Sequence, residues 1–251
     1  MRKKLFIVSD VHGHYQELMA ALKNVGYDAE NEAHIFVSCG DLFDRGTEND
    51  KVYEFVKGLK RKILIKGNHE DILFRVLMEG RMTDDALANG TDITVSQIFG
   101  KDSVDGNGRF DKESNKEKTE EMLAFLDSML NYYESGNYVL THGWLPIVFE
   151  SRYPEISSMW REAADLDWNE AHWLEWQQLY GVKATLDGKT IVCGHRPARL
   201  GYMFDDRREP DCNEPFYGEG MIAIDANTVR SGFVNVLVLE GNKTNEGISW
   251  S

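Results

Sequence analysis

The sequence predicts a protein of the α/β class, and three features of its 251 residues support this prediction. Short apolar runs alternate with segments of helical spacing over residues 5–78, a pattern typical of a sheet covered by helices. Polar clusters rich in Asp, His and Gly follow most of the apolar runs, where open α/β sheets bind their ligands. With 42% hydrophobic and 28% charged residues, the composition is that of a globular protein with a sizeable core.

The first part of the chain contains three strand–helix units. Apolar runs at residues 5–8, 34–38 and 63–65 predict buried strands. Apolar positions at helical spacing predict helices over residues 15–25, 50–59 and 71–78. Further strands are expected at residues 138–141, 190–193, 221–225 and 233–239, and the aromatic-rich residues 157–180 are expected to be helical in their second half.

Residues 80–136 depart from this alternation, and we interpret them as a helical cap inserted into a single domain of residues 1–251. They contain a turn at residues 89–92 and a short apolar stretch at residues 93–99. Residues 101–115 are rich in Asp, Gly, Asn and Ser and predict a mobile loop. Residues 117–132 predict a helix with one apolar stripe.

The net charge and the cysteines indicate which binding partners are disfavoured and in which cellular compartment the protein is expected. The formal net charge of −14 disfavours nucleic acid and anionic membranes as partners. No apolar run is long enough for a membrane helix or a signal peptide. Cys39, Cys193 and Cys212 form no CxxC pair, so we expect reduced thiols and a cytoplasmic protein. The sequence does not define the oligomeric state.

Five polar clusters contain the residues with the clearest chemistry. They are Asp10-Val11-His12-Gly13, Gly40-Asp41-Leu42-Phe43-Asp44-Arg45-Gly46, Gly67-Asn68-His69-Glu70, His142-Gly143 and Gly194-His195. Each alone fits an ordinary turn, since Asp and Asn beside Gly are common turn residues. All five in this order indicate a metal site, because oxygen and imidazole ligands recur without any thiolate.

Such ligands suit a pair of cations about 3.5–4 Å apart, which can clamp the attacking and leaving oxygens of a phosphoryl transfer. Asp10 and His12 alternate along an extended segment and therefore face the same side. With Asp41 as the bridge they would form one metal site. The other site would contain Asp41, Asn68, His142 and His195. This mixture favours Mn²⁺, Fe or Zn²⁺ over a structural zinc site.

The clusters resemble the calcineurin-like metallophosphoesterase superfamily. The Gly-Asp-x-x-Asp-Arg-Gly and Gly-Asn-His-Glu forms resemble its phosphoprotein phosphatase branch, which includes bacterial serine/threonine phosphatases and symmetrical dinucleoside tetraphosphatases. The matching motifs extend from Asp10 to His195. The resemblance implies a two-sheet β-sandwich flanked by helices and two divalent metal ions, with Mn²⁺ first and Fe or Zn²⁺ as alternatives.

The resemblance also implies roles for individual residues. His69 would be the general acid for the leaving oxygen, oriented by Asp44. Arg45 and Asn68 would bind the substrate phosphate. Arg161, which follows a tryptophan, resembles the second phosphate-binding arginine of bacterial members, and a surface arginine is an equal alternative. The late Asp-Thr-Gly motif of the branch appears here as Asp225-Ala226-Asn227.

The expected reaction is phosphoester hydrolysis by direct attack of a metal-bound hydroxide, without a phosphoenzyme. Phosphoserine or phosphothreonine in proteins is the first substrate class that the sequence suggests. A symmetrical dinucleoside tetraphosphate hydrolase is the alternative, and a non-catalytic phosphate-binding regulatory protein is a third hypothesis. The expected partner is therefore a phosphorylated protein or a small phosphoester. The tryptophans of residues 160–176 are expected to pack in the core and not to stack on bases.

Overall fold

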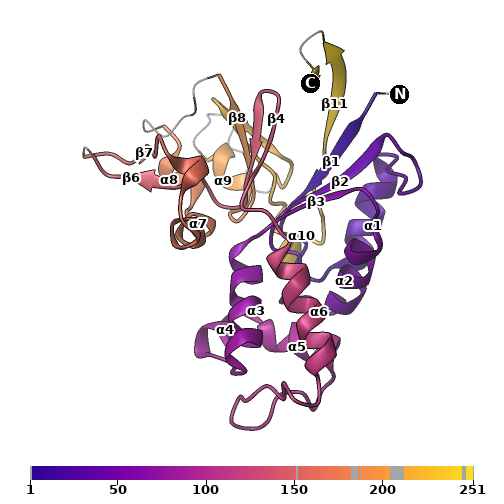
Figure 1. The fold of residues 1–251 in the computed structure, drawn as a ribbon. Helices are drawn as coiled ribbons and strands as arrows, with labels where there is room; N and C mark the ends of the chain where they lie inside the picture. The colour runs from indigo at the N-terminus through magenta and orange to yellow at the C-terminus, as the bar shows by residue number, and fades with distance from the viewer. Residues whose placement is uncertain are drawn as a thin grey trace.

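The computed structural model describes residues 2–150, 152–181, 186, 188–203, 212–244 and 247–250. Two five-stranded sheets pack against each other, and helices cover the outer face of each sheet (Figure 1). The predicted α/β class and the sandwich flanked by helices are therefore confirmed. Among the described helices, none combines the length and the apolar character that a membrane span requires.

The first sheet has the strand order β12-β11-β1-β2-β3. Its strands are β1 (Lys4–Val8), β2 (His34–Cys39), β3 (Lys62–Ile65), β11 (Leu237–Thr244) and β12 (Gly247–Trp250). Strands β1, β2 and β3 are parallel, and α1 (Tyr15–Asn24) and α2 (Asn49–Gly58) connect them as predicted. β11 begins later than the predicted residue 233, because α10 (Thr228–Ser231) precedes it and the Asn235 side chain bonds to the Ile224 carbonyl.

The second sheet has the strand order β4-β5-β8-β10-β9. Its strands are β4 (Tyr133–Ser135), β5 (Tyr138–Leu140), β8 (Thr190–Cys193), β9 (Phe216–Gly218) and β10 (Met221–Ala223). β5, β8 and β10 are parallel, and the two edge strands are antiparallel to their neighbours. A small separate ribbon joins β6 (Ile147–Val148) to β7 (Glu155–Ile156).

Side chains of β1 alternate between two hydrophobic layers. Leu5 and Ile7 lie in the core between the sheets, where Val192 of the second sheet also packs. Phe6 and Val8 lie in the layer beneath the helices. Because both faces of this strand are buried, its sequence is a continuous apolar run without alternation.

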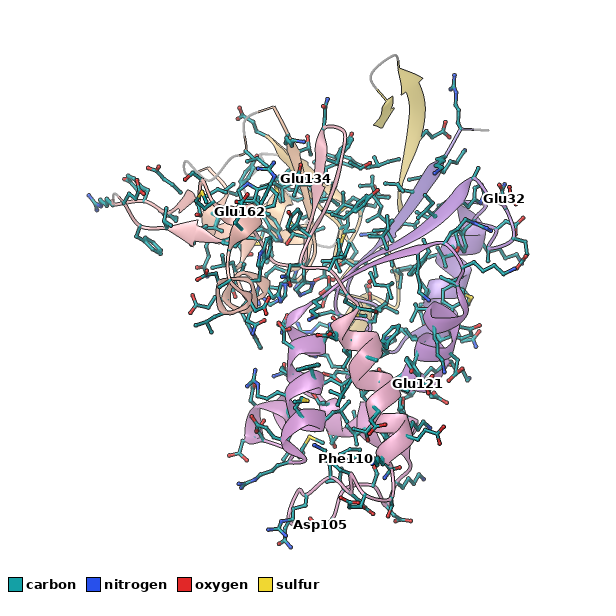
Figure 2. The ribbon with its side chains drawn as sticks, in the orientation of Figure 1. Glu32, Asp105, Phe110, Glu121, Glu134 and Glu162 are labelled. Atoms are coloured by element: carbon teal, nitrogen blue, oxygen red, sulfur yellow. The ribbon has the colours of Figure 1, made fainter. Side chains whose placement is uncertain are left out.

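Most of residues 80–136 extend the helical layer of the first sheet as a lobe, whereas residues 133–135 form β4 of the second sheet (Figure 1). The helices of the lobe are α4 (Asp84–Asn89), α5 (Thr91–Phe99) and α6 (Lys116–Asp127), and they pack against α3 (Asn68–Glu79). Figure 2 shows Phe110 at the end of the lobe far from the sheets, and it belongs to the same buried cluster as the helices. α6 ends at Asp127, before the predicted residue 132, and the N–H of Leu130 donates to the carbonyl of Leu64 in β3.

The outer face of the second sheet is covered by short helices. They are the 3₁₀ turn η1 (Trp160–Glu162), α7 (Asp165–His172), α8 (Trp176–Leu179) and α9 (Arg199–Tyr202). Trp160, Trp168 and Trp176 are buried in this layer, as expected from the sequence. Trp173 differs, because 41% of its surface is exposed.

The packing of the lobe generates a stability prediction. Leu126 on α6 is fully buried, so Leu126→Ala is expected to lower the free energy of unfolding by about 2–5 kcal/mol. Leu87→Ala, on α4 of the same lobe, is the matched control, because Leu87 is 51% exposed and its loss should cost less than about 1 kcal/mol. Urea unfolding followed by circular dichroism measures both. Equally small effects would contradict a core shared between the lobe and the sheet.

Candidate active site

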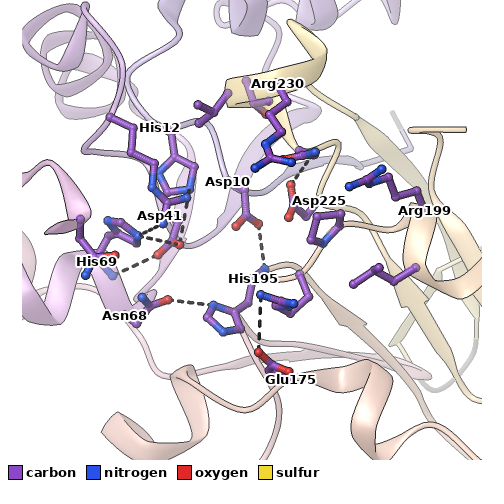
Figure 3. Close-up of a pocket in the computed structure, with 18 of the residues that line it drawn as sticks. Asp10, His12, Asp41, Asn68, His69, Glu175, His195, Arg199, Asp225 and Arg230 are labelled. Atoms are coloured by element: carbon purple, nitrogen blue, oxygen red, sulfur yellow. Dashed lines mark hydrogen bonds and ion pairs between the residues drawn. The ribbon is translucent and has the colours of Figure 1, made fainter. Parts of the chain in front are cut away.

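Parallel strands of both sheets deliver the predicted residues to one edge of the sandwich (Figure 3). β1, β2 and β3 of the first sheet and β5, β8 and β10 of the second end there. The residues that follow these strands are Asp10, His12, Asp41, Asn68, His69, His142, His195 and Asp225. A site therefore lies where the carboxyl ends of the strands of two sheets meet.

The backbone of these strand-end loops is strained. Non-glycine residues seldom adopt a positive φ, and such strain concentrates at functional sites. In the described part of the chain the residues that do so are Asp10, His12, Asp41, Asp44, Arg45, His195 and Asn227. Six of these seven belong to the predicted clusters, and Asn227 lines the same pocket.

Two glycines permit the close approach of these loops. A Cβ at Gly67 would overlap Oδ1 of Asp41, and a Cβ at Gly194 would overlap Oδ2 of Asp10. Both carboxylates therefore pack directly against the backbone at positions where only glycine leaves enough space.

Asp41 lies at the centre of the site. Its carboxylate is 3.3 Å from Nε2 of His142 and 3.8 Å from Nε2 of both His12 and His69. The backbone N–H of His69, in the first turn of α3, donates to Oδ1 of Asp41, where the helix dipole favours an anion. Burial alone would raise the pKa of Asp41, but the neighbouring histidines outweigh it and hold this pKa well below its usual value.

Besides Asp44, three further carboxylates are buried around Asp41, and these are Asp10, Glu70 and Asp225. Burial raises the pKa of Asp10 to about 6 and that of Glu70 to about 7, and it also raises the pKa of Asp225. Buried carboxylates are costly unless they are paired or coordinate a metal. Glu70 is compensated by the backbone, because it accepts hydrogen bonds from the N–H groups of Asp41, Leu42 and Gly67.

The donor set fits two divalent cations that share Asp41. Two groups of potential metal ligands are present among the described residues, and both contain Asp41. Within each group, the ligand atoms lie within 4.8 Å of one another. The first group adds His142 and His195, as predicted. Oδ1 of Asn68, the other ligand expected there, lies 3.0 Å from a ring nitrogen of each of these histidines.

The second group places His12 and His69 with Asp41. Asp10, the expected third ligand with His12 and Asp41, lines the pocket nearby. Its Oδ2 accepts hydrogen bonds from Oγ–H of Ser9 at 2.5 Å and from the N–H of His195 at 2.9 Å. The structure therefore brings the predicted metal ligands together at this edge of the sandwich. Asp10 is bound there by the N–H of His195, which follows β8 of the second sheet.

Backbone carbonyls orient two of the imidazoles. Nδ1–H of His12 donates to the Phe43 carbonyl at 2.9 Å, and Nδ1–H of His142 donates to the Cys39 carbonyl at 2.7 Å. Each Nε2 is left facing Asp41, which is the arrangement of a metal-binding histidine. Burial lowers the pKa of His12, which favours the neutral form that binds metal.

A second unit beside Asp41 consists of His69, Asp44 and Arg45. Nδ1–H of His69 donates to Oδ2 of Asp44 at 2.7 Å, as predicted for an oriented general acid. Burial would lower the pKa of His69, but Asp41 and Asp44 outweigh it and raise this pKa. The Arg45 guanidinium donates to Nε2 of His69 and to Nε2 of His12, both at 2.9 Å.

Two threonines of α5 hold Asp44 in place, and the sequence did not identify them. Thr91 donates to Oδ2 of Asp44 at 2.8 Å, and Thr94 donates to Oδ1 at 2.6 Å. All three side chains are buried. The predicted insertion thus supports the site by fixing the carboxylate that orients His69.

Arg161 does not line the pocket that contains most of the other predicted site residues, and it contacts none of them. Its Nε–H donates to Oε1 of Glu134 at 2.5 Å, and its guanidinium lies 4.2 Å from the centre of the Trp160 ring. Figure 2 shows Glu134 on β4. The alternative of a surface arginine describes this placement.

The pocket has a volume of about 600 Å³ and a second wall that the sequence did not identify. This second wall comprises Trp173, Glu175, Arg196, Pro197, Arg199, Leu200, Asn227 and Arg230. These residues come from separate loops and short helices, so no spacing in the sequence connects them. Of these residues, only Asn227 belongs to a motif that the sequence identified, Asp225-Ala226-Asn227.

The chain is similar in sequence to known phosphoesterases. The family model described as "Calcineurin-like phosphoesterase" matches residues 3–220. The asymmetrical bis(5'-nucleosyl)-tetraphosphatase PrpE of Bacillus subtilis is 26% identical over 147 residues, covering 54% of this chain and 55% of that protein. The symmetrical bis(5'-nucleosyl)-tetraphosphatase of Coxiella burnetii is 33% identical over 84 residues, covering 34% of this chain and 28% of that protein. The chain therefore matches about half of the first relative's length and less of the second.

A solved structure shares the fold. The cold-active protein-tyrosine phosphatase of a psychrophilic Shewanella species superposes with a TM-score of 0.54 at 18% sequence identity. The match covers 95% of this chain and 77% of that one. At this identity the likeness concerns the arrangement of helices and strands.

The shared position of Asp41 generates a metal-binding prediction. Asp41→Ala is expected to empty both cation sites, because one carboxylate serves both ligand groups. Elemental analysis of the purified protein measures the metal content per chain. Asp71→Ala, which removes a carboxylate of α3 that pairs with His172, is the control and should retain the metal of the unaltered chain. Two metals per chain in Asp41→Ala would refute the bridge.

Proposed function

The chain belongs to the calcineurin-like phosphoesterase family, and on this premise we propose that it is a metal-dependent phosphoester hydrolase with a dinuclear centre. The observation that carries the proposal is the position of Asp41 between two ligand groups, beside the His69–Asp44 pair and Arg45. A non-catalytic phosphate-binding protein needs no oriented proton donor, and the buried His69–Asp44 pair supports catalysis instead.

The proposed cofactors are two divalent ions, with Mn²⁺ first and Fe or Zn²⁺ as alternatives. Asp10, His12 and Asp41 would hold one ion, and Asp41, Asn68, His142 and His195 the other. When bound, such ions polarise phosphate oxygens and lower the pKa of water so that it can act as the nucleophile. The free, buried thiols of Cys39 and Cys193 support a reducing cytoplasmic compartment.

The side chains of this chain supply binding and proton transfer. Arg45 and Asn68 would bind oxygens of the reacting phosphate, since the planar guanidinium matches a phosphate edge. In its protonated form, with Arg45 turned from Nε2 to the phosphate, His69 would donate the proton at Nε2 to the leaving oxygen as the P–O bond breaks. Asp44, held by the two threonines of α5, stabilises the protonated ring and fixes its orientation. One water is consumed for each phosphoester cleaved.

Two substrate classes remain, and we place dinucleoside tetraphosphates first. The relatives from B. subtilis and C. burnetii are named for that activity, and a pocket of about 600 Å³ is larger than one phosphate group requires. Phosphoserine and phosphothreonine are second, favoured by the form of the motifs at residues 40–46 and 67–70. The sequence suggested the opposite order because its motifs describe only the reacting phosphate.

A substrate panel tests the proposed function. The Mn²⁺-supplemented chain is assayed with p-nitrophenyl phosphate, phosphoserine and phosphothreonine peptides, and diadenosine tetraphosphate. We expect metal-dependent hydrolysis, with the tetraphosphate cleaved most efficiently by kcat/KM. Efficient peptide cleavage with an inert tetraphosphate would reverse the substrate order. No metal-dependent hydrolysis of any compound would refute the hydrolase and favour a binding protein.

Substitution of His69 tests the proton donor. His69→Asn is expected to lower kcat about 10²- to 10⁴-fold, as for the loss of a general acid. The metal content should stay unchanged, because the proposed ligands beside Asp41 are Asp10 and His12, and a loss of metal would instead make His69 a ligand, as its place in the second group allows. His34→Asn is a matched control, because His34 begins β2 at the end of the strand opposite the site. Unchanged turnover in His69→Asn would remove the proposed role.

A further inference from the structure

The second wall of the pocket has no part in the hydrolysis proposed above, although it faces the same space. The end of β8, α9 and the loop around α10 form most of it. Figure 3 shows Arg199 and Arg230 on the side of Asp10 opposite His69. A ligand that fills the pocket therefore contacts both the metal-ligand end and this arginine-rich side.

The second wall concentrates positive charge in a chain whose net charge is −14. Every Lys or Arg side chain that lines the pocket is an arginine, and these residues are Arg45, Arg196, Arg199 and Arg230. Arginine binds phosphate through a planar fork of donors, whereas lysine offers a single point charge. The residue type therefore indicates an anionic ligand with several oxygens.

The carboxylates of the pocket compensate only part of the positive charge of its arginines. Nη1 of Arg196 lies 3.5 Å from Oε1 of Glu175, so these two charges compensate each other. Within the described ranges, neither Arg199 nor Arg230 forms an ion pair, and Nε of Arg199 is buried without a hydrogen-bond partner. Asp225 is the remaining carboxylate of the arginine-rich side, and its Oδ1 accepts from the N–H of Asn227.

An aromatic side chain completes the second wall. Trp173 lines the pocket, is 41% exposed, and packs edge-on against His195 with ring centres 6.1 Å apart. The other tryptophans of this layer are buried, so Trp173 alone among them offers an open aromatic surface to the pocket. A planar base can stack on such a surface. The volume of about 600 Å³ is within the usual range for sites that hold small organic ligands.

We propose that Arg199 and Arg230 form a second anion subsite, which binds phosphates of a nucleoside polyphosphate beyond the phosphate that reacts. The proposal rests on the proposed hydrolase and assigns substrate selection in the same pocket to these two residues. The reacting phosphate binds at Arg45, the next phosphates bind at Arg199 and Arg230, and Trp173 contacts the nucleoside.

The subsite acts on binding and leaves the bond-breaking step to the other end of the pocket. In that step the oxygen of water joins the reacting phosphorus, the P–O–P bridge breaks, and the departing phosphate retains the bridging oxygen. A phosphoserine peptide or p-nitrophenyl phosphate has a single phosphate and gains nothing from the subsite. The two arginines therefore discriminate between the two substrate classes.

Paired substitutions test the subsite. The variants are Arg199→Gln, Arg230→Gln and the double variant, with Arg75→Gln on the exposed surface of α3 as control. In the metal-loaded full chain, the double variant should raise KM for diadenosine tetraphosphate at least about tenfold, as for the loss of charged hydrogen bonds. Its kcat/KM for p-nitrophenyl phosphate should stay within about twofold of the unaltered chain. A double Lys variant should recover part of the tetraphosphate affinity.

A binding measurement separates failure of the subsite from failure of the hydrolase. Calorimetry with a methylene-bridged, non-hydrolysable diadenosine tetraphosphate should show at least about tenfold weaker binding in the double Gln variant. Unchanged binding, or an equal loss of kcat/KM for both substrates, would overturn the subsite while leaving the hydrolase intact. If the unaltered chain hydrolyses nothing, the same calorimetry still decides whether these arginines bind a polyphosphate.

Discussion

Buried negative charge is the constraint on which the rest of this structure depends. Asp10, Asp41, Glu70 and Asp225 each expose 5% of their surface or less, and a desolvated carboxylate needs a positive partner to stay ionised. Backbone N–H groups satisfy Glu70, and histidines surround Asp41. The strained turns after the strands, and the glycines beside them, follow from the need to bring these groups within contact distance. Two cations at Asp41 would complete the compensation.

The ligand set could be predicted from the sequence because each ligand lies within a few residues of a strand end. Once the strands are parallel, topology alone brings Asp10, Asp41 and Asn68 to one edge. Arg161 illustrates the limit of such reasoning. A sequence motif describes only residues that are close in the chain. The partner of the Arg161 guanidinium is Glu134, which is 27 residues away and belongs to no motif.

The fold was predictable at the level of class and less so in detail. The periodicity identified β1, β2, β3 and the first two helices because apolar runs and helical faces are local signals. The apolar stretch at residues 93–99 is a helix, and its partner α4 ends at Gly90 in a left-handed conformation that the sequence suggested only as a turn. The arginine-rich side of the pocket could not be predicted from the sequence for a related reason. Arg199 and Arg230 are far apart in the chain and come to the same pocket because β8 and β10 are neighbours in the second sheet.

Anomalous diffraction from crystals of the Mn²⁺-loaded protein tests the dinuclear centre most directly. We expect two manganese peaks about 3.5–4 Å apart, with the Asp41 carboxylate between them and His142 and His195 around one of the two. A single peak, or two peaks of which neither contacts Asp41, would contradict the shared carboxylate.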